Sequence, residues 1–169
     1  MGRALAFTLV GGRDAWMLAD RLKSAGTGVI LAGTFNRPAR RDEAYDIPFT
    51  TPAKLHAAGV KFCLALRTDG CNRTTNERNL PYEAALAAAF GLPREDALKV
   101  VTLHAADLLG VADELGSIDL GKRATLIVTD GDPLEVTSSV LIALIDGARI
   151  DLRNRQTELY HKYRQRLGQ

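Results

Sequence analysis

The sequence predicts an α/β fold, and two observations support this prediction. Through about the first 110 residues, short apolar runs alternate with segments of helical periodicity, which is typical of βα units around a parallel sheet. Beyond them, short β-type runs are separated by turns that contain Gly and Pro. We expect three segments, namely an α/β segment over 1–112, a β-rich segment over 113–152 and a charged helical tail over 153–169.

The α/β segment is expected to begin with three strands. They are the apolar runs 4–10, 28–32 and 60–66. The third run is almost continuously apolar, as in a strand covered on both faces. Between the first two strands, Trp16, Ala19 and Leu22 recur at helical spacing and the helix stops at Gly26. A Gly11-Gly12 pair precedes this helix, but it lacks the further glycines or the Lys of a phosphate-binding motif.

A long loop is expected over 33–50, and loops of this length are often functional. Thr51 is then expected to cap a helix with Pro52 at its first position, which ends near Gly59. Further along, the patterns predict three helices and three strands. The helices are 80–90, 93–101 and 102–109, and the strands are 117–118, 124–129 and 140–145. A turn at Asp146-Gly147 follows the last strand.

Composition excludes several classes of protein. The net charge is only +2, and no basic helix is interleaved with aromatic residues, so neither indicates a nucleic-acid partner. No apolar stretch approaches the roughly 18 residues of a membrane span, and no signal peptide is recognisable, so we expect no membrane partner and a cytoplasmic protein. Cys63 and Cys71 do not form a CxxC motif and are expected to be free thiols.

Two sequence runs carry a family resemblance. They are GSIDLGKRATLIV, from Gly116 to Val128, and DGDPL at 130–134. Together they resemble the closing β segment of metal-dependent amidohydrolases. Upstream, NLPYE at 79–83, GLP at 91–93 and the Ala97-Leu98 pair resemble the last barrel helices of the imidazolonepropionase-like branch of that superfamily. The resemblance extends over nearly the whole chain.

This resemblance implies a partial TIM barrel followed by a segment of a small β-sandwich. The chain would supply the last three βα units of a metal-dependent hydrolase barrel. Three strands cannot close a barrel, because strand number, tilt and shear must agree. The first strand would therefore be an open edge, which favours association with a homo-oligomeric copy or with a complementing N-terminal half-barrel.

The resemblance also implies a chemistry, in which one or two divalent metal ions, typically zinc, activate water for hydrolysis. The intact family holds its metal through an HxH pair, often a modified Lys, two further His and an Asp after the last strand. This sequence contains no HxH, and no His follows the expected first strand. A divalent metal is therefore expected for the intact family, and the alternative for this chain alone is that it holds none.

Asp69 is the one ligand that the resemblance carries over, as a metal ligand and proton acceptor. It lies three residues beyond the third expected strand, where an Asx-turn before Gly70 is the alternative. Arg67, Arg73, Arg78 and Asn79 cluster in the same loop and are candidates for binding a substrate carboxylate or amide. A solvated loop is the alternative for these four residues.

The histidines have structural explanations. His56 is expected in a helix as a packing or surface residue, His104 at the start of a short helix as a capping residue, and His161 exposed in the charged tail. No two of them have metal-ligand spacing on one element.

These observations leave three functional hypotheses. The first is an amidohydrolase-related protein whose lineage hydrolyses C–N bonds other than peptide bonds, in cyclic or small amides, but which is catalytically incomplete alone. The second is half of a split amidohydrolase completed by a partner chain, which would then act on a small-molecule amide. The third is a non-catalytic module that dimerises through its open edge.

Overall fold

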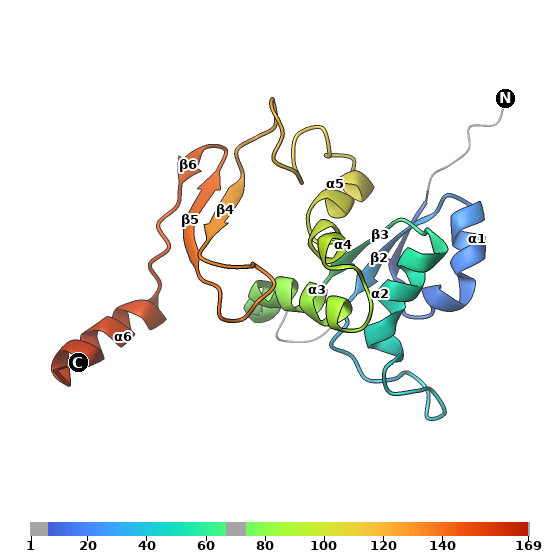
Figure 1. Ribbon diagram of the computed structural model, residues 1–169, viewed down its shortest axis with the longest axis horizontal. Helices are drawn as coiled ribbons and strands as arrows, with labels where there is room; N and C mark the ends of the chain where they lie inside the picture. The colour runs from blue at the N-terminus through green and yellow to red at the C-terminus, as the bar shows by residue number, and fades with distance from the viewer. Residues whose placement is uncertain (1–6, 67–73, 169) are drawn as a thin grey trace.

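A three-stranded parallel sheet lies at the centre of the α/β segment in the computed structural model, which describes residues 7–66 and 74–168 (Figure 1). Its strands are β1 (Thr8–Gly11), β2 (Gly28–Ala32) and β3 (Phe62–Ala65), in the order β1-β2-β3. Thr8 pairs with Gly28, and Val29 pairs with Phe62. The three predicted strands are thus confirmed where residues are described, and the sheet is parallel as expected.

Helices connect and cover these strands. They are η1 (Ala15–Leu18), α1 (Ala19–Ser24), α2 (Ile47–Ala58), η2 (Thr74–Asn79), α3 (Leu80–Ala89), α4 (Arg94–Lys99) and α5 (Leu103–Leu109). In Figure 1, α3, α4 and α5 lie between the parallel sheet and the strands that follow. The helices predicted over 80–90, 93–101 and 102–109 are confirmed, with bounds that differ by up to two residues. Gly59 and Gly110 end α2 and α5 with φ values of 73° each, in the left-handed region that glycine readily adopts.

The beginning of α2 corrects a prediction. The helix starts at Ile47 and not at Thr51, with Pro48 in its first turn and Pro52 inside it. Thr51 is almost completely buried, and its hydroxyl donates to the Ile47 carbonyl oxygen at 2.7 Å, so it is a helix residue and not a cap. Pro52 has no N–H, so the carbonyl oxygen of Pro48 in the preceding turn receives no helix hydrogen bond from it.

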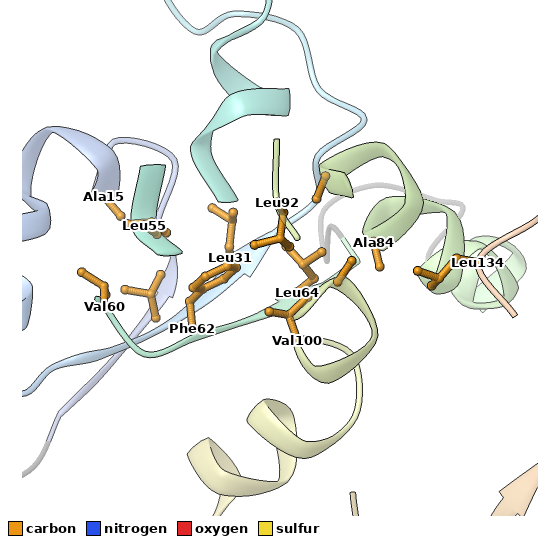
Figure 2. Packing of buried hydrophobic residues seen from close by; sticks show 13 residues of the cluster. Ala15, Leu31, Leu55, Val60, Phe62, Leu64, Ala84, Leu92, Val100 and Leu134 are labelled. Atoms are coloured by element: carbon orange, nitrogen blue, oxygen red, sulfur yellow. The ribbon is translucent and has the colours of Figure 1, made fainter. Parts of the chain in front are cut away.

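The core lies between the parallel sheet and the helices (Figure 2). Leu31, Leu55 and Val100 are at most 3% exposed and come from β2, α2 and the residue after α4. Phe62 and Leu64 lie on one face of β3 and Cys63 on the other, and all three are buried, so both faces of that strand are covered, as its composition predicts. The small buried residues Ala84, Ala87 and Ala97 let the helices approach this sheet closely.

A second, antiparallel sheet forms the β-rich segment. It contains β4 (Leu126–Thr129), β5 (Val140–Ile145) and β6 (Ala148–Arg149), in the order β4-β5-β6. Asp146 and Gly147 both have positive φ, 50° and 81°, as a two-residue hairpin turn between β5 and β6 requires. Residues 113–152 show this one sheet, so the β-sandwich stays a prediction.

The strand predicted at 117–118 is wrong. Local side-chain hydrogen bonds replace strand pairing there, because the Ser117 hydroxyl donates to Asp119 Oδ2 and Lys122 Nζ donates to the Ser117 oxygen, each at 2.5 Å. Ile118 and Leu120 are exposed beside them.

One ion-pair cluster joins the β-rich segment to the helices. Arg94, on α4, donates to Asp132 Oδ2 at 2.7 Å and to Glu135 Oε1 at 2.6 Å. Between these two carboxylates, Leu134 is 3% exposed and belongs to the main core. The Asp-Pro-Leu turn therefore anchors the β-rich segment by burying one leucine.

The tail forms the predicted helix, α6 (Arg155–Arg166), and every residue in it is exposed. Asn154 and Thr157 form a reciprocal capping box, with the Thr157 N–H donating to Asn154 Oδ1 at 3.0 Å. In Figure 1 this helix projects away from both sheets. No helix among the described residues has the length and apolar character needed to cross a bilayer.

Candidate functional site

The carboxyl ends of β2 and β3 lie side by side and define the candidate site. Ala32, the last residue of β2, pairs with Ala65, the last residue of β3. The Gly33 N–H donates to the Ala65 carbonyl oxygen at 2.7 Å. Parallel α/β sheets bind ligands at this edge, because the loops that follow neighbouring strands meet there. The segments that begin at residues 33 and 66 leave the sheet together at this place.

The residues predicted for the site are only partly within the described structure. Arg67, Asp69 and Arg73 lie outside the described residues. Arg78 is exposed and Asn79 is half-buried, both in η2. Asn79 occupies the N-cap position of α3, but its side chain makes no capping hydrogen bond. The roles of all five residues stay predictions.

Metal ligands do not gather within residues 7–66 and 74–168, where no three His, Cys, Asp or Glu side chains are close enough to hold an ion. His56 Nε2 lies 3.7 Å from Asp96 Oδ2 at the surface. His104 is half-buried at the second position of α5, whose N-cap is Thr102, so its predicted capping role is wrong. His161 is exposed on α6, as predicted. The described residues do not match the donor set that a catalytic zinc ion needs.

Glu83 on α3 is a polar residue at this edge that the sequence analysis missed. Its side chain is buried, and its Oε2 accepts hydrogen bonds from the Thr34 N–H, the Thr34 hydroxyl and the Phe35 N–H, the last at 2.9 Å. Thr34 is fully buried. A carboxylate with several donors is well compensated for its burial. Glu83 thereby fixes the start of the 33–46 loop against α3.

One sequence signal pointed to Glu83. It is the single charged residue in the ten-residue apolar helix α3, and its neighbours Ala84 and Ala87 are buried. A carboxylate among buried alanines needs internal donors, because water does not reach it. The donors come from a loop 48 residues away in sequence, which no local pattern reveals.

A hollow lies beside the end of β2. It encloses about 320 Å³ of non-protein space, including its opening to solvent. Its apolar walls come from the end of β2 and the start of α2, and its polar lining is Arg13, Asn36, Arg37, Glu43 and Thr51. Its enclosed part has room for about one water-sized group, so a larger ligand would place one small polar group inside and the rest in the opening to solvent.

Glu43 is the most buried charged side chain of the hollow, at 7% exposed. Its Oε2 accepts from the Ala39 N–H at 2.5 Å and from the Arg40 N–H at 3.3 Å. Its Oε1 is buried and accepts no hydrogen bond from the described residues, although Arg40 Nη1 lies 3.6 Å away. One oxygen of a buried carboxylate is therefore left for a further donor.

The arginines around the hollow differ in their pairing. Arg40 forms two hydrogen bonds with Asp14, at 3.0 and 2.6 Å, and this interaction lowers the pKa of the Asp14 carboxyl. Arg13 and Arg37 line the hollow and form no ion pair with any carboxylate of the described ranges. Two guanidinium groups are thus available to an anionic group of a ligand.

Gly12 has a packing role. Its φ is +59°, and a Cβ there would lie 2.6 Å from Val29 Cγ1. Gly11, with φ +99°, has open space around it. The pair therefore turns the chain closely over β2, and this explains it without a bound phosphate.

Comparison with known proteins points in one direction. Residues 19–154 match the profile of the family described as "Amidohydrolase family". The chain is 40% identical over 76 residues to Amidohydrolase tasK of Hapsidospora irregularis, covering 45% of this chain and 8% of that protein. It is 33% identical over 122 residues to the imidazolonepropionase of Acidiphilium cryptum, covering 70% of this chain and 28% of that protein.

A solved structure agrees with the sequence matches. The crystal structure of an amidohydrolase from Thermotoga maritima superposes with a TM-score of 0.73 at 28% identity. The superposition covers 86% of this chain and 37% of that one. The mixed α/β fold is therefore that of amidohydrolase structures, and the predicted imidazolonepropionase-like resemblance is confirmed. The chain spans well under half the length of each of these proteins.

Proposed function

The chain belongs to the amidohydrolase family, and from this we propose that it forms the last three βα units of a metal-dependent hydrolase barrel together with a segment of its β-sandwich. Its lineage hydrolyses C–N bonds other than peptide bonds, in cyclic or small amides. One observation carries the proposal. The parallel strands β2 and β3 end at one edge, from which the chain continues directly toward Asp69.

We propose that Asp69 contributes one metal ligand in the completed enzyme and accepts a proton from the attacking water. A divalent metal such as zinc, when bound, supplies a hydroxide at neutral pH by lowering the pKa of its water. The remaining ligands come from barrel strands that this chain does not contribute. The binding of the reacting amide by Arg67, Arg73, Arg78 and Asn79 belongs to the same proposal.

The chain is catalytically incomplete in isolation under this proposal. Two features support it. The described residues lack a three-ligand cluster. In addition, β1 pairs only with β2 among the described strands, and Phe7 and Val10 at this edge are 66% and 68% exposed. An exposed apolar edge strand is a site for another strand. We propose that further barrel strands, on the same polypeptide or on a partner chain, pair with β1.

A second candidate function rests on the same edge. If β1 pairs with β1 of another copy, the chain is a non-catalytic module that dimerises. The two candidates differ in stoichiometry. Light scattering coupled to size-exclusion chromatography gives a discrete dimer of about 37 kDa for the module, twice the 18.3 kDa of one chain.

The test of the enzymatic proposal combines metal analysis with complementation. The isolated chain is expected to hold substoichiometric zinc and to hydrolyse none of a panel of cyclic and small linear amides. Coexpression with the amino-terminal segment of the Thermotoga maritima amidohydrolase, up to its matched region, is expected to give a complex with stoichiometric zinc and measurable hydrolysis. Asp69→Ala in that complex should abolish hydrolysis, and Asp113→Ala, at an exposed position, should not.

Stoichiometric zinc in the isolated chain, removed by Asp69→Ala, would overturn the proposed incompleteness. A discrete dimer that neither binds zinc nor associates with the added segment would favour the dimerising module.

A further inference from the structure

The hollow beside β2 has the composition of a binding site for one small charged group. Arg13 and Arg37 bring two guanidinium groups, and Glu43 brings one carboxylate. Arg40, the other cation close to Glu43, is paired with Asp14 at 2.6 Å. The charge facing the hollow is therefore about one positive unit, which matches a monoanion and not a dianion.

The hollow lies close to the carboxyl ends of β2 and β3, where the proposed reaction takes place. Its wall includes Ala32 and Gly33, and the Gly33 N–H bonds to the Ala65 carbonyl oxygen at 2.7 Å. From Ala65 the chain continues to Asp69. The wall of the hollow therefore adjoins the end of β3, after which Asp69 follows in the sequence.

Glu43 adds a second recognition element. Its side chain is 93% buried, counted from its 7% exposure, and its Oε1 accepts no hydrogen bond within the described residues. Leaving a buried carboxylate oxygen without a donor is unfavourable. An N–H group of a ligand would satisfy it, whereas a second carboxylate or a phosphate would be repelled.

We propose that the hollow binds the carboxylate and the adjacent amide N–H of an N-acyl amino acid, with Arg13 and Arg37 holding the carboxylate and Glu43 accepting the N–H. This inference rests on the proposed function and narrows its substrate class to amides that carry a carboxylate. Guanidinium groups bind carboxylates through paired, charge-assisted hydrogen bonds. The substrate's acid end would lie here, beside the carboxyl end of β2.

The test is binding to the metal-free 169-residue chain, followed through the Arg side-chain Nε–Hε signals in NMR. N-acetylglycine is expected to shift the Arg13 and Arg37 signals with a dissociation constant on the order of millimolar, as for a small fragment. Arg13→Gln and Arg37→Gln should each weaken binding about tenfold. Arg41→Gln is the matched control, because Arg41 is exposed on the same loop and does not line the hollow.

Three further probes distinguish the parts of the proposal. N-acetylglycinamide lacks the carboxylate, and N-acetylsarcosine lacks the N–H. Inorganic phosphate lacks the N–H and carries more negative charge than a monoanion. Each should bind about tenfold more weakly than N-acetylglycine. These probes test Glu43 without changing it, which matters because Glu43 also holds the backbone of its own loop.

Equal binding of the neutral amide, tighter binding of phosphate, or equal weakening by Arg41→Gln would overturn the proposal. The measurement needs neither metal nor hydrolysis. A failure here therefore leaves the metal and complementation results standing, and a failure of those leaves this binding result standing.

Discussion

Replacing Glu83 tests the proposed anchoring of the 33–46 loop most directly. Glu83→Ala removes the acceptor of the Thr34 N–H and of the Phe35 N–H, whereas the Thr34 hydroxyl keeps the carbonyl oxygen of residue 83 as an acceptor at 3.0 Å. Phe35 is 58% exposed, so water can reach its backbone, but Thr34 is fully buried. Each buried donor left without an acceptor costs about 1–3 kcal/mol. We expect Glu83→Ala to lower the free energy of unfolding by about 1.5–4.5 kcal/mol, from the stranded Thr34 N–H and the lost Phe35 hydrogen bond.

Glu83→Gln separates the contribution of the carboxylate charge from that of the side-chain shape at the same position. Gln keeps one acceptor oxygen but loses the charge that strengthens the hydrogen bonds, so we expect a smaller loss of about 1–2 kcal/mol. Glu77→Ala is the control, because Glu77 is exposed on η2, and it should change stability by less than about 0.5 kcal/mol. Urea unfolding followed by circular dichroism and by the fluorescence of the single tryptophan, Trp16, gives all three values.

Two results would contradict the proposed role of Glu83. If Glu83→Ala unfolds at the same urea concentration as the Glu77→Ala control, the buried hydrogen bonds do not hold the loop. If Gln and Ala cost the same, the charge contributes and the remaining oxygen does not.

Three further outcomes are expected. Leu55→Ala should cost about 2–5 kcal/mol in urea unfolding, because Leu55 is fully buried in the core, and a loss below 1 kcal/mol would contradict its position. Gly12→Ala should lower the melting temperature clearly more than Gly11→Ala, since both strain the backbone but only Gly12 lacks space for a Cβ; equal shifts would count against the close packing. Asp151 should titrate near 2 by carboxyl NMR, because hydrogen bonds from Arg153 lower its pKa to about 2, and Arg153→Gln should raise that pKa toward the ordinary 3.8. Since the folded pKa is the lower one, its stabilisation is present above 3.8 and is lost as the pH falls toward 2.

Periodicity predicted the elements that short-range chemistry determines. The strand over 28–32 agrees residue for residue, and α3 and α5 end at or within one residue of their predicted ends. The alternation of apolar strands with glycine-terminated helices was enough to predict these elements, because each of them buries one continuous face. The Asp146-Gly147 turn was equally readable, since a two-residue hairpin needs positive φ at both positions.

Other features depended on contacts that the sequence does not display. The start of α2 was misplaced because Thr51 and Pro52 resemble a helix beginning, whereas burial of Thr51 and its bond to Ile47 place it one turn inside. Strand formation at 117–118 lost to hydrogen bonds between Ser117 and its neighbours. Glu83 was missed because its donors come from a loop 48 residues away in sequence. Glu43 was missed because its donors are local and its burial is not visible in the sequence.

The parallel and the antiparallel sheet are expected to form at different rates during folding. Thr8 must find Gly28, and Val29 must find Phe62, each across an intervening helical connection. Such non-local pairings form slowly, because the loop must close before any contact stabilises it. The β5-β6 hairpin closes through two residues, and hairpins of this kind form in roughly microseconds. During refolding the carboxyl-terminal hairpin is therefore expected to form before β1 pairs with β2. The chain is most prone to aggregation while the parallel strands are still unpaired.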